Sequence, residues 1–155
     1  MNEFFKLAIE QARLGLSEVT ENVPGIPIGA VLVINGVVVG RGHNQRVQLG
    51  SAILHAEIDC LKNAGRLDAG DYAQAVLYST LSPCDMCSGA ALLYKIPRIV
   101  IGENKTFKGP EEYLRSRGID LTILQDETCI ELMNEYKAKY PHIWNQDIGE
   151  PSFSE

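Results

Sequence analysis

Four residues in two short motifs have the types and spacing needed to bind a metal ion and move a proton. His55 and Glu57 are separated by one residue inside the apolar stretch SAILHAEIDC, and Cys84 and Cys87 form a Cys-x-x-Cys pair in LSPCDMC. Ionisable groups are costly to bury unless they are paired or bind a metal. The two motifs therefore predict that these side chains are partners for an ion and for one another.

Together, the two cysteines and His55 can supply three ligands to a zinc ion. Cys84 and Cys87 are three residues apart, so they share one face of a helix. The start of a helix favours thiolate, the form of cysteine that binds metal. Three protein ligands leave a fourth position open for water, as in catalytic zinc sites. Zinc acidifies that water, and Glu57 beside it can serve as general base and general acid.

Simpler interpretations exist for each motif taken alone. A Cys-x-x-Cys pair can be a redox pair, or half of a structural zinc site that needs a second pair of ligands. The other cysteines, Cys60 and Cys129, are far apart in amphipathic segments, so we expect them to be small core residues. His-x-Glu followed by Pro-Cys-x-x-Cys is, in combination, the signature of zinc-dependent base deaminases.

The hydrophobic pattern predicts alternating helices and strands around these motifs. Helices are expected over residues 2–21, 55–65, 83–95, 110–118 and 126–140, and strands over 28–34, 37–44, 75–81, 98–103 and 119–124. Pro83 suits the first position of a helix, Asp126 suits an N-cap, and Asn35–Gly36 suits a tight hairpin. Residues 141–155 are expected to be irregular. A hairpin followed by alternating strands and helices predicts an α/β fold, a three-layer α/β/α sandwich around a five-stranded mixed sheet.

Composition places further limits on function. The 155 residues suit a single domain, which we assign to residues 1–150, with residues 151–155 as a disordered tail. The net charge of −6 opposes non-specific binding of nucleic acid. No apolar run is long enough to span a membrane, and the N-terminus lacks the features of a secretory signal. We therefore expect a cytoplasmic protein with reduced thiols.

At these motifs the chain resembles the cytidine and deoxycytidylate deaminase superfamily. The segments GRGHN, LSPCDMC and DIGE are most similar to the fungal-type cytosine deaminases, which act on the free base, and the resemblance runs from about Pro27 to Glu150. It implies a homodimer with one zinc ion per chain, held by His55, Cys84 and Cys87. It also implies hydrolysis of cytosine to uracil and ammonia in pyrimidine salvage, by attack of zinc-bound hydroxide on C4 with Glu57 as proton shuttle. 5-Fluorocytosine should also be accepted.

The resemblance also implies a set of substrate-binding residues. The base would be bound through Asn44, Ala56, Ser82 and Asp147, while Ile28, Leu81, Phe107 and Trp144 would line or cover the pocket. Ala56 stands where the fungal enzymes have glycine, which should change only the pocket shape. Without the resemblance, Asn44 could cap a turn, Trp144 could be ordinary packing, and Asp147 could be a solvated tail residue.

Other functions remain open at this level. Another deaminase of the superfamily could act on guanine, on another free base, or on adenosine in tRNA, and an inactive relative could be a non-catalytic zinc module. An RNA substrate needs a groove for a stem-loop and a flipped base, which the acidic chain does not favour. Glu57 argues against the non-catalytic module, because a structural zinc site has no need of a carboxylate.

Overall fold

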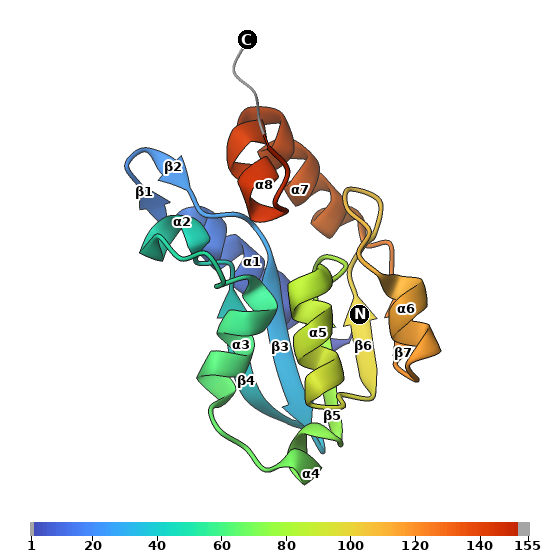
Figure 1. The fold of residues 1–155 in the computed structure, drawn as a ribbon. Coiled ribbons are helices and arrows are strands. Elements are labelled where there is room, and N and C mark those ends of the chain that lie inside the picture. The colour runs from blue at the N-terminus through green and yellow to red at the C-terminus, as the bar shows by residue number, and fades with distance from the viewer. Residues whose placement is uncertain (1, 152–155) are drawn as a thin grey trace.

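A five-stranded mixed sheet forms the centre of the protein in the computed structural model, which describes residues 2–151 (Figure 1). Its strands are β3 (Gly29–Ile34), β4 (Val37–His43), β5 (Ala75–Ser79), β6 (Arg98–Ile101) and β7 (Asp120–Ile123), in the order β4-β3-β5-β6-β7. The strand β3 is antiparallel to β4 and β5, whereas β5, β6 and β7 are parallel. The predicted mixed sheet of five strands is confirmed.

The β3–β4 hairpin turns at the Asn-Gly pair that the sequence predicts. Asn35 and Gly36 both have positive φ, 50° and 77°, which the tightest hairpin turns require. Ile34 then pairs directly with Val37, and the register continues to Gly29 opposite His43, with one irregularity at Leu32/Val33. The turn thereby brings the end of β4, and the residues that follow it, beside the start of β3.

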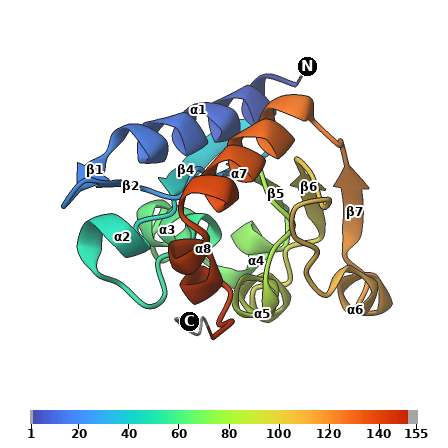
Figure 2. The same ribbon diagram turned by 90° about the horizontal axis from the view of Figure 1, so that it is seen from above.

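Helices cover both faces of the sheet, which confirms the three-layer α/β/α sandwich (Figure 2). The helices α1 (Glu3–Ser17) and α7 (Glu127–Lys139) lie on one side, and α3 (Ala56–Ala64) and α5 (Asp85–Leu93) on the other. Three short helices complete these connections: α2 (Arg46–Leu49), α4 (Ala69–Tyr72) and α6 (Glu111–Ser116). The helix α8 (Pro141–Asp147) lies over the N-terminal ends of α3 and α5 in both views.

Alternate residues of the strands pack into two cores, one on each face. Phe5, Val31 and Tyr78 belong to the core beneath α1, while the larger core beneath α3 and α5 contains Leu32 and Leu77. Cys60 and Cys129 are 0 % and 2 % exposed, so the prediction that both are core residues is confirmed. The two layers of helices are therefore held independently against a common sheet.

Two predicted helix boundaries are wrong: the C-terminal end of the first helix and the start of the helix predicted from Pro83. The first helix ends at Ser17 instead of residue 21, because the chain turns through Glu21 and Asn22, both at positive φ. That turn joins two short strands, β1 (Val19–Thr20) and β2 (Val23–Pro24). The helix predicted from Pro83 begins at Asp85, because Cys84 has an extended backbone (φ −69°, ψ 179°) and is its N-cap.

The prediction of an irregular tail is also wrong over residues 141–147. Pro141 occupies the first turn of α8, where its fixed φ suits a helix. Trp144 and Asp147 are buried against the rest of the molecule, so tertiary packing stabilises a helix that the local pattern does not reveal. Of the predicted disordered tail, residues 152–155 lie outside the described part of the chain.

No helix within residues 2–151 is long and apolar enough to cross a membrane. The cytoplasmic location stays a prediction.

Candidate active site

The predicted metal ligands stand at the starts of two neighbouring helices. His55 is the N-cap of α3, and Cys84 is the N-cap of α5. The helix α3 can approach β4 closely because of the glycines in GRGHN: a Cβ on Gly42 would lie 2.3 Å from the backbone nitrogen of Cys60. This close packing brings the start of α3 beside the end of β4 and places His55 near Asn44.

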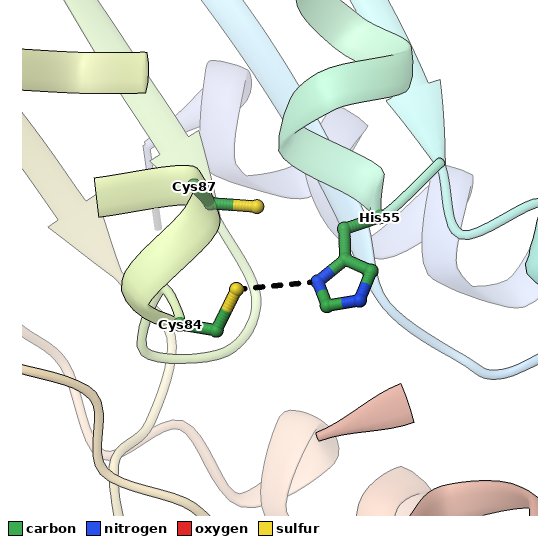
Figure 3. Close-up of side chains that lie close together, drawn as sticks. All are labelled: His55, Cys84 and Cys87. Atoms are coloured by element: carbon green, nitrogen blue, oxygen red, sulfur yellow. Dashed lines mark hydrogen bonds between the residues drawn. The ribbon is translucent and has the colours of Figure 1, made fainter. Parts of the chain in front are cut away.

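His55, Cys84 and Cys87 converge, as Figure 3 shows. The Sγ atom of Cys84 lies 3.4 Å from Nδ1 of His55, and the three ligand atoms all lie within 4.8 Å of one another. Ligands around tetrahedral zinc are separated by about 3.5–3.8 Å, as its bond lengths require. Two thiol sulfurs and one imidazole nitrogen are also the donor set that zinc prefers. The arrangement therefore fits a zinc ion with three protein ligands.

The protonation states of His55, Cys84 and Cys87 depend on one another. The hydrogen bond from Cys87 lowers the pKa of Cys84 to about 4, and the same bond raises the pKa of Cys87. Burial lowers the pKa of His55, but the Cys84 thiolate and the carboxylates of Asp147 and Glu57 outweigh it and raise the value to about 9. At neutral pH, before any metal binds, the Cys84 thiolate is therefore paired with a protonated His55, and metal binding would release that proton.

Glu57 lies in the first turn of α3, and only 4 % of its surface is exposed. Burial, and then the charge of Cys84, raise its pKa to about 7. A carboxyl group with a pKa near the working pH exchanges protons readily in both directions. Perturbed carboxyl groups in a pocket also mark candidate catalytic residues. The structure thus gives Glu57 the properties of an acid–base group beside the metal position.

Asp147 links three of the residues around the site. Its Oδ1 atom accepts a 2.8 Å hydrogen bond from Nδ2 of Asn44 and lies 3.5 Å from both Nε2 of His55 and the guanidinium of Arg46. A histidine that binds metal commonly offers its other ring nitrogen to a carboxylate. Burial raises the pKa of Asp147, against the opposing effect of His55, Asn44 and Arg46.

A narrow pocket with a cavity volume of about 10 Å³ adjoins the metal ligands. Its lining consists of Ile28, His55, Ala56, Glu57, Leu81, Ser82, Cys84, Phe107, Trp144, Asp147 and Ile148. The other two predicted site residues are buried beside it: Asn44 contacts it through Asp147, and Cys87 through the ligand cluster. A wider cavity outside it is lined in part by Arg46, Met86 and Lys108.

Ser82 supports the pocket in a way that its type alone does not reveal. Its hydroxyl donates to Oε2 of Glu111 at 2.7 Å and accepts from the backbone nitrogen of Gly109 at 3.0 Å. Its side chain therefore fixes the loop before α6, so a contact with a ligand would come from the Ser82 backbone.

The sequence analysis missed several residues that shape this site. Arg46 lies beside Asp147, Ile148 lines the inner pocket, and the buried carboxylates of Glu103 and Glu111 hold the loop that carries Phe107. A signal was available for one of them, because Glu103 directly follows the apolar strand RIVIG, where an acid is unexpected. Phe107 and Trp144 meet edge to face, with ring centroids 5.9 Å apart.

The model of the cytidine and deoxycytidylate deaminase zinc-binding region matches residues 2–103 of this chain. The chain belongs to the cytidine and deoxycytidylate deaminase family. The resemblance inferred from the motifs is thereby confirmed. A family defined by its zinc-binding region, together with the geometry of His55, Cys84 and Cys87, makes zinc the cofactor of this deaminase.

Among curated relatives, a cytosine deaminase of Candida albicans is 45 % identical over 146 residues, which is 94 % of each chain. A tRNA-specific adenosine deaminase of Streptococcus pyogenes is 36 % identical over 110 residues, 70 % of this deaminase and 66 % of that protein.

Two solved structures have the same fold. One, from studies of A-to-I editing by tRNA:A34 deaminases, has a TM-score of 0.68 at 29 % identity and covers 83 % of this chain and 97 % of that one. The guanine deaminase of Nitrosomonas europaea has a TM-score of 0.71 at 25 % identity, covering 87 % and 83 %.

Proposed function

We propose that this deaminase hydrolyses free cytosine to uracil and ammonia. One observation carries the proposal: His55, Cys84 and Glu57 line a narrow pocket that is covered by Phe107 and Trp144. A pocket this narrow favours a single base, admitted as the cover opens, over a nucleoside or an RNA strand. The extended similarity to the cytosine deaminase of Candida albicans supports the same substrate.

The residues of the chain suggest how the reaction proceeds. Zinc held by His55, Cys84 and Cys87 would supply a water molecule acidified to near neutrality, which would be the nucleophile. Glu57 would take a proton from this water and deliver it to N3 of the ring as the water oxygen bonds to C4. Glu57 would then take the second proton from the oxygen now bonded to C4 and give it to the amino group. The C4–N bond would break, so that ammonia leaves and the C4 oxygen becomes the carbonyl of uracil. A buried carboxyl group with a pKa of about 7 can carry out each of these transfers.

Asn44 and Asp147 would orient the base. Asn44 is held on both sides, since its Oδ1 accepts from the backbone nitrogen of Arg46 at 3.0 Å and its Nδ2 donates to Asp147. Polar groups fixed in this way discriminate strongly against a ligand that leaves them unpaired. The backbones of Ala56 and Ser82 would add contacts, while Ile28, Leu81, Phe107 and Trp144 would exclude water.

Deamination of adenosine in tRNA is less well supported. The relatives with that activity share lower identity over a smaller part of the chain. The net charge of −6 also opposes a phosphate backbone. A guanine substrate would use the same zinc and Glu57 and differ only in its contacts with the pocket.

Ammonia release by the purified, zinc-loaded protein tests the proposal directly. Cytosine, cytidine, guanine and a tRNA anticodon stem-loop are offered in parallel, and turnover is expected with cytosine. Glu57→Gln should keep its zinc, and its kcat should fall by about 10²–10⁴-fold, which is the usual contribution of a positioned acid–base group. Glu112→Gln, which alters an exposed acid on α6, is the matched control. Guanine turnover without cytosine turnover, or activity retained in Glu57→Gln, would refute the proposal.

We also propose that the protein forms a homodimer through the outer face of α5. Met86 and Leu93, seven residues apart, are 36 % and 70 % exposed, and Gly89 between them faces open space. A helix that is apolar all round belongs inside a larger structure. Light scattering after size exclusion should give a dimer for the wild type and a monomer for Leu93→Asp. Val19→Asp, at a similarly exposed apolar residue on β1, should remain dimeric.

A further inference from the structure

The cover of the pocket is built from two segments that are separate in the sequence. Phe107 lies in the loop between β6 and α6, whereas Trp144 lies on α8. Neither segment belongs to the central sheet, and the two rings meet only edge to face at 5.9 Å. An edge-to-face pair of rings is a modest interaction. The closed cover therefore needs a further contact that joins the loop to α8.

Lys137 on α7 provides such a contact on both sides. Its Nζ atom donates a 2.6 Å hydrogen bond to the carbonyl oxygen of Thr106, the residue before Phe107. The same ammonium lies 5.6 Å from the centroid of the Trp144 ring, within the range of a cation–π interaction. One charged group thus touches both halves of the cover.

The Thr106 carbonyl is a firm attachment point because Glu103 holds the loop from within. This carboxylate is fully buried, and it accepts hydrogen bonds from the backbone nitrogens of Lys105 and Thr106 at 2.7 and 2.9 Å and from the Thr106 hydroxyl. These hydrogen bonds brace the loop that carries Phe107, so a contact that fixes Thr106 also fixes Phe107.

We propose that Lys137 is a positioning residue that fastens the Phe107 loop to Trp144 and so controls how freely the pocket opens. It touches neither the zinc ligands nor the space for the base. Its effect on substrate choice rests on the proposed deamination of cytosine, but its effect on the cover does not. Loss of Lys137 would let Trp144 and the loop separate and admit larger ligands and water.

The rest of α7 should withstand this change. Cys129, Met133 and Tyr136 are buried on this helix, and the hydroxyl of Tyr136 donates to the carbonyl oxygen of Pro24 at 2.8 Å. Lys139, two residues further on, is exposed and serves as the matched control. A substitution that acts only through the charge or stability of α7 would affect both positions alike.

The test uses the fluorescence of Trp144, the single tryptophan of the chain. Acrylamide quenching is measured on zinc-loaded wild type, Lys137→Met, Lys137→Arg and Lys139→Met. Trp144 is only 4 % exposed, so the wild-type quenching constant should be low. Lys137→Met should raise it by about three- to tenfold, as expected for losing one cation–π contact and one charged hydrogen bond. Lys137→Arg should stay near the wild type, and Lys139→Met should match it.

Kinetics provide the second measurement. Lys137→Met should raise KM for cytosine by about three- to tenfold with kcat lowered by less than twofold, because the chemical groups are untouched. It should also raise the ratio of cytidine to cytosine turnover. Should Lys137→Met fail to fold, Lys137→Gln, which is shorter and uncharged, supports the same two measurements. Zinc content and circular dichroism verify that each variant is intact.

The proposal is overturned if Trp144 in Lys137→Met is quenched like the wild type, or if Lys139→Met opens the cover equally. If the quenching constant of Trp144 rises as much in Lys137→Arg as in Lys137→Met, the proposed role of the positive charge is overturned. The two proposals fail separately. Absence of cytosine turnover with the expected quenching refutes the substrate and leaves the role of Lys137 intact. Normal cytosine turnover with unchanged quenching in Lys137→Met refutes the role of Lys137 and leaves the substrate intact.

Discussion

Replacing Asp147 by asparagine separates two roles that the structure combines in one carboxylate. Asparagine has nearly the same size and can still accept the hydrogen bond from Nδ2 of Asn44, which measures 2.8 Å with the native residue. It removes the negative charge that lies 3.5 Å from Nε2 of His55 and from the guanidinium of Arg46. The substitution therefore tests the charge and leaves the packing of α8 in place.

The expected magnitude follows from these contacts. Losing the carboxylate behind a metal-binding histidine costs about 10- to 100-fold in metal affinity or activity. Losing a charged hydrogen bond to the base would remove about 1.5–3 kcal/mol more, which is about another 10- to 100-fold. We therefore expect the zinc dissociation constant of Asp147→Asn to rise by about 10- to 100-fold. With zinc in excess only the lost contact with the base remains, so we expect kcat/KM for cytosine to fall by about 10- to 100-fold.

Competition with a chromogenic chelator measures the zinc affinity, and ammonia release at saturating zinc measures kcat/KM. Glu150→Gln, at an exposed acid in the same segment, is the control and should change neither quantity. The thermal midpoint should hardly change, because burying a neutral amide is less costly than burying a carboxylate. Zinc affinity equal to that of the wild type would refute the role of Asp147 behind His55, even if activity fell.

Three further outcomes are expected. Gly42→Ala should destabilise the fold by about 1–3 kcal/mol in thermal unfolding, because its Cβ would lie 2.3 Å from the Cys60 backbone. Gly70→Ala, where a Cβ meets open space, should not, and equal midpoints for the two variants would contradict the packing. After chelation of zinc, iodoacetamide at neutral pH should label Cys84, because hydrogen bonding lowers the pKa of its thiol to about 4. Cys129 should be spared because it is buried. Labelling of Cys129 without Cys84, detected by mass spectrometry, would refute this. Cytidine should be turned over far more slowly than cytosine, because Trp144 closes the space for a ribose, and comparable kcat/KM values would refute the closed cover.

The zinc ligands could be predicted from the sequence because their geometry is local. Cys84 and Cys87 belong to the start of one helix, and His55 begins another, so each motif carries its own positioning. The hairpin was equally predictable, since Asn35 and Gly36 take the positive φ that their types favour. The strands followed from apolar runs that are buried on both faces.

The helix α8 and its contacts could not be predicted in this way. Asp147 bonds to Asn44 across 103 residues of sequence, and Trp144 meets Phe107 from a different segment. Residues 141–147 carry no regular apolar pattern, and the helix is stabilised by what it packs against. The partners of Asp147 and Lys137 are thus properties of the tertiary structure, which no local spacing reports.

The residues of the site fall into two groups, one inside the region matched by the family model and one C-terminal to it. The family match ends at residue 103, and it includes every zinc ligand, Glu57 and Asn44. Phe107, Trp144 and Asp147 all lie beyond it, yet they line the same pocket. The cytosine deaminase of Candida albicans aligns with 94 % of this chain, whereas the tRNA-specific adenosine deaminase of Streptococcus pyogenes aligns with 70 %. We therefore expect the two helix starts to carry the hydrolytic chemistry, and the C-terminal segment that closes over them to determine the choice of substrate.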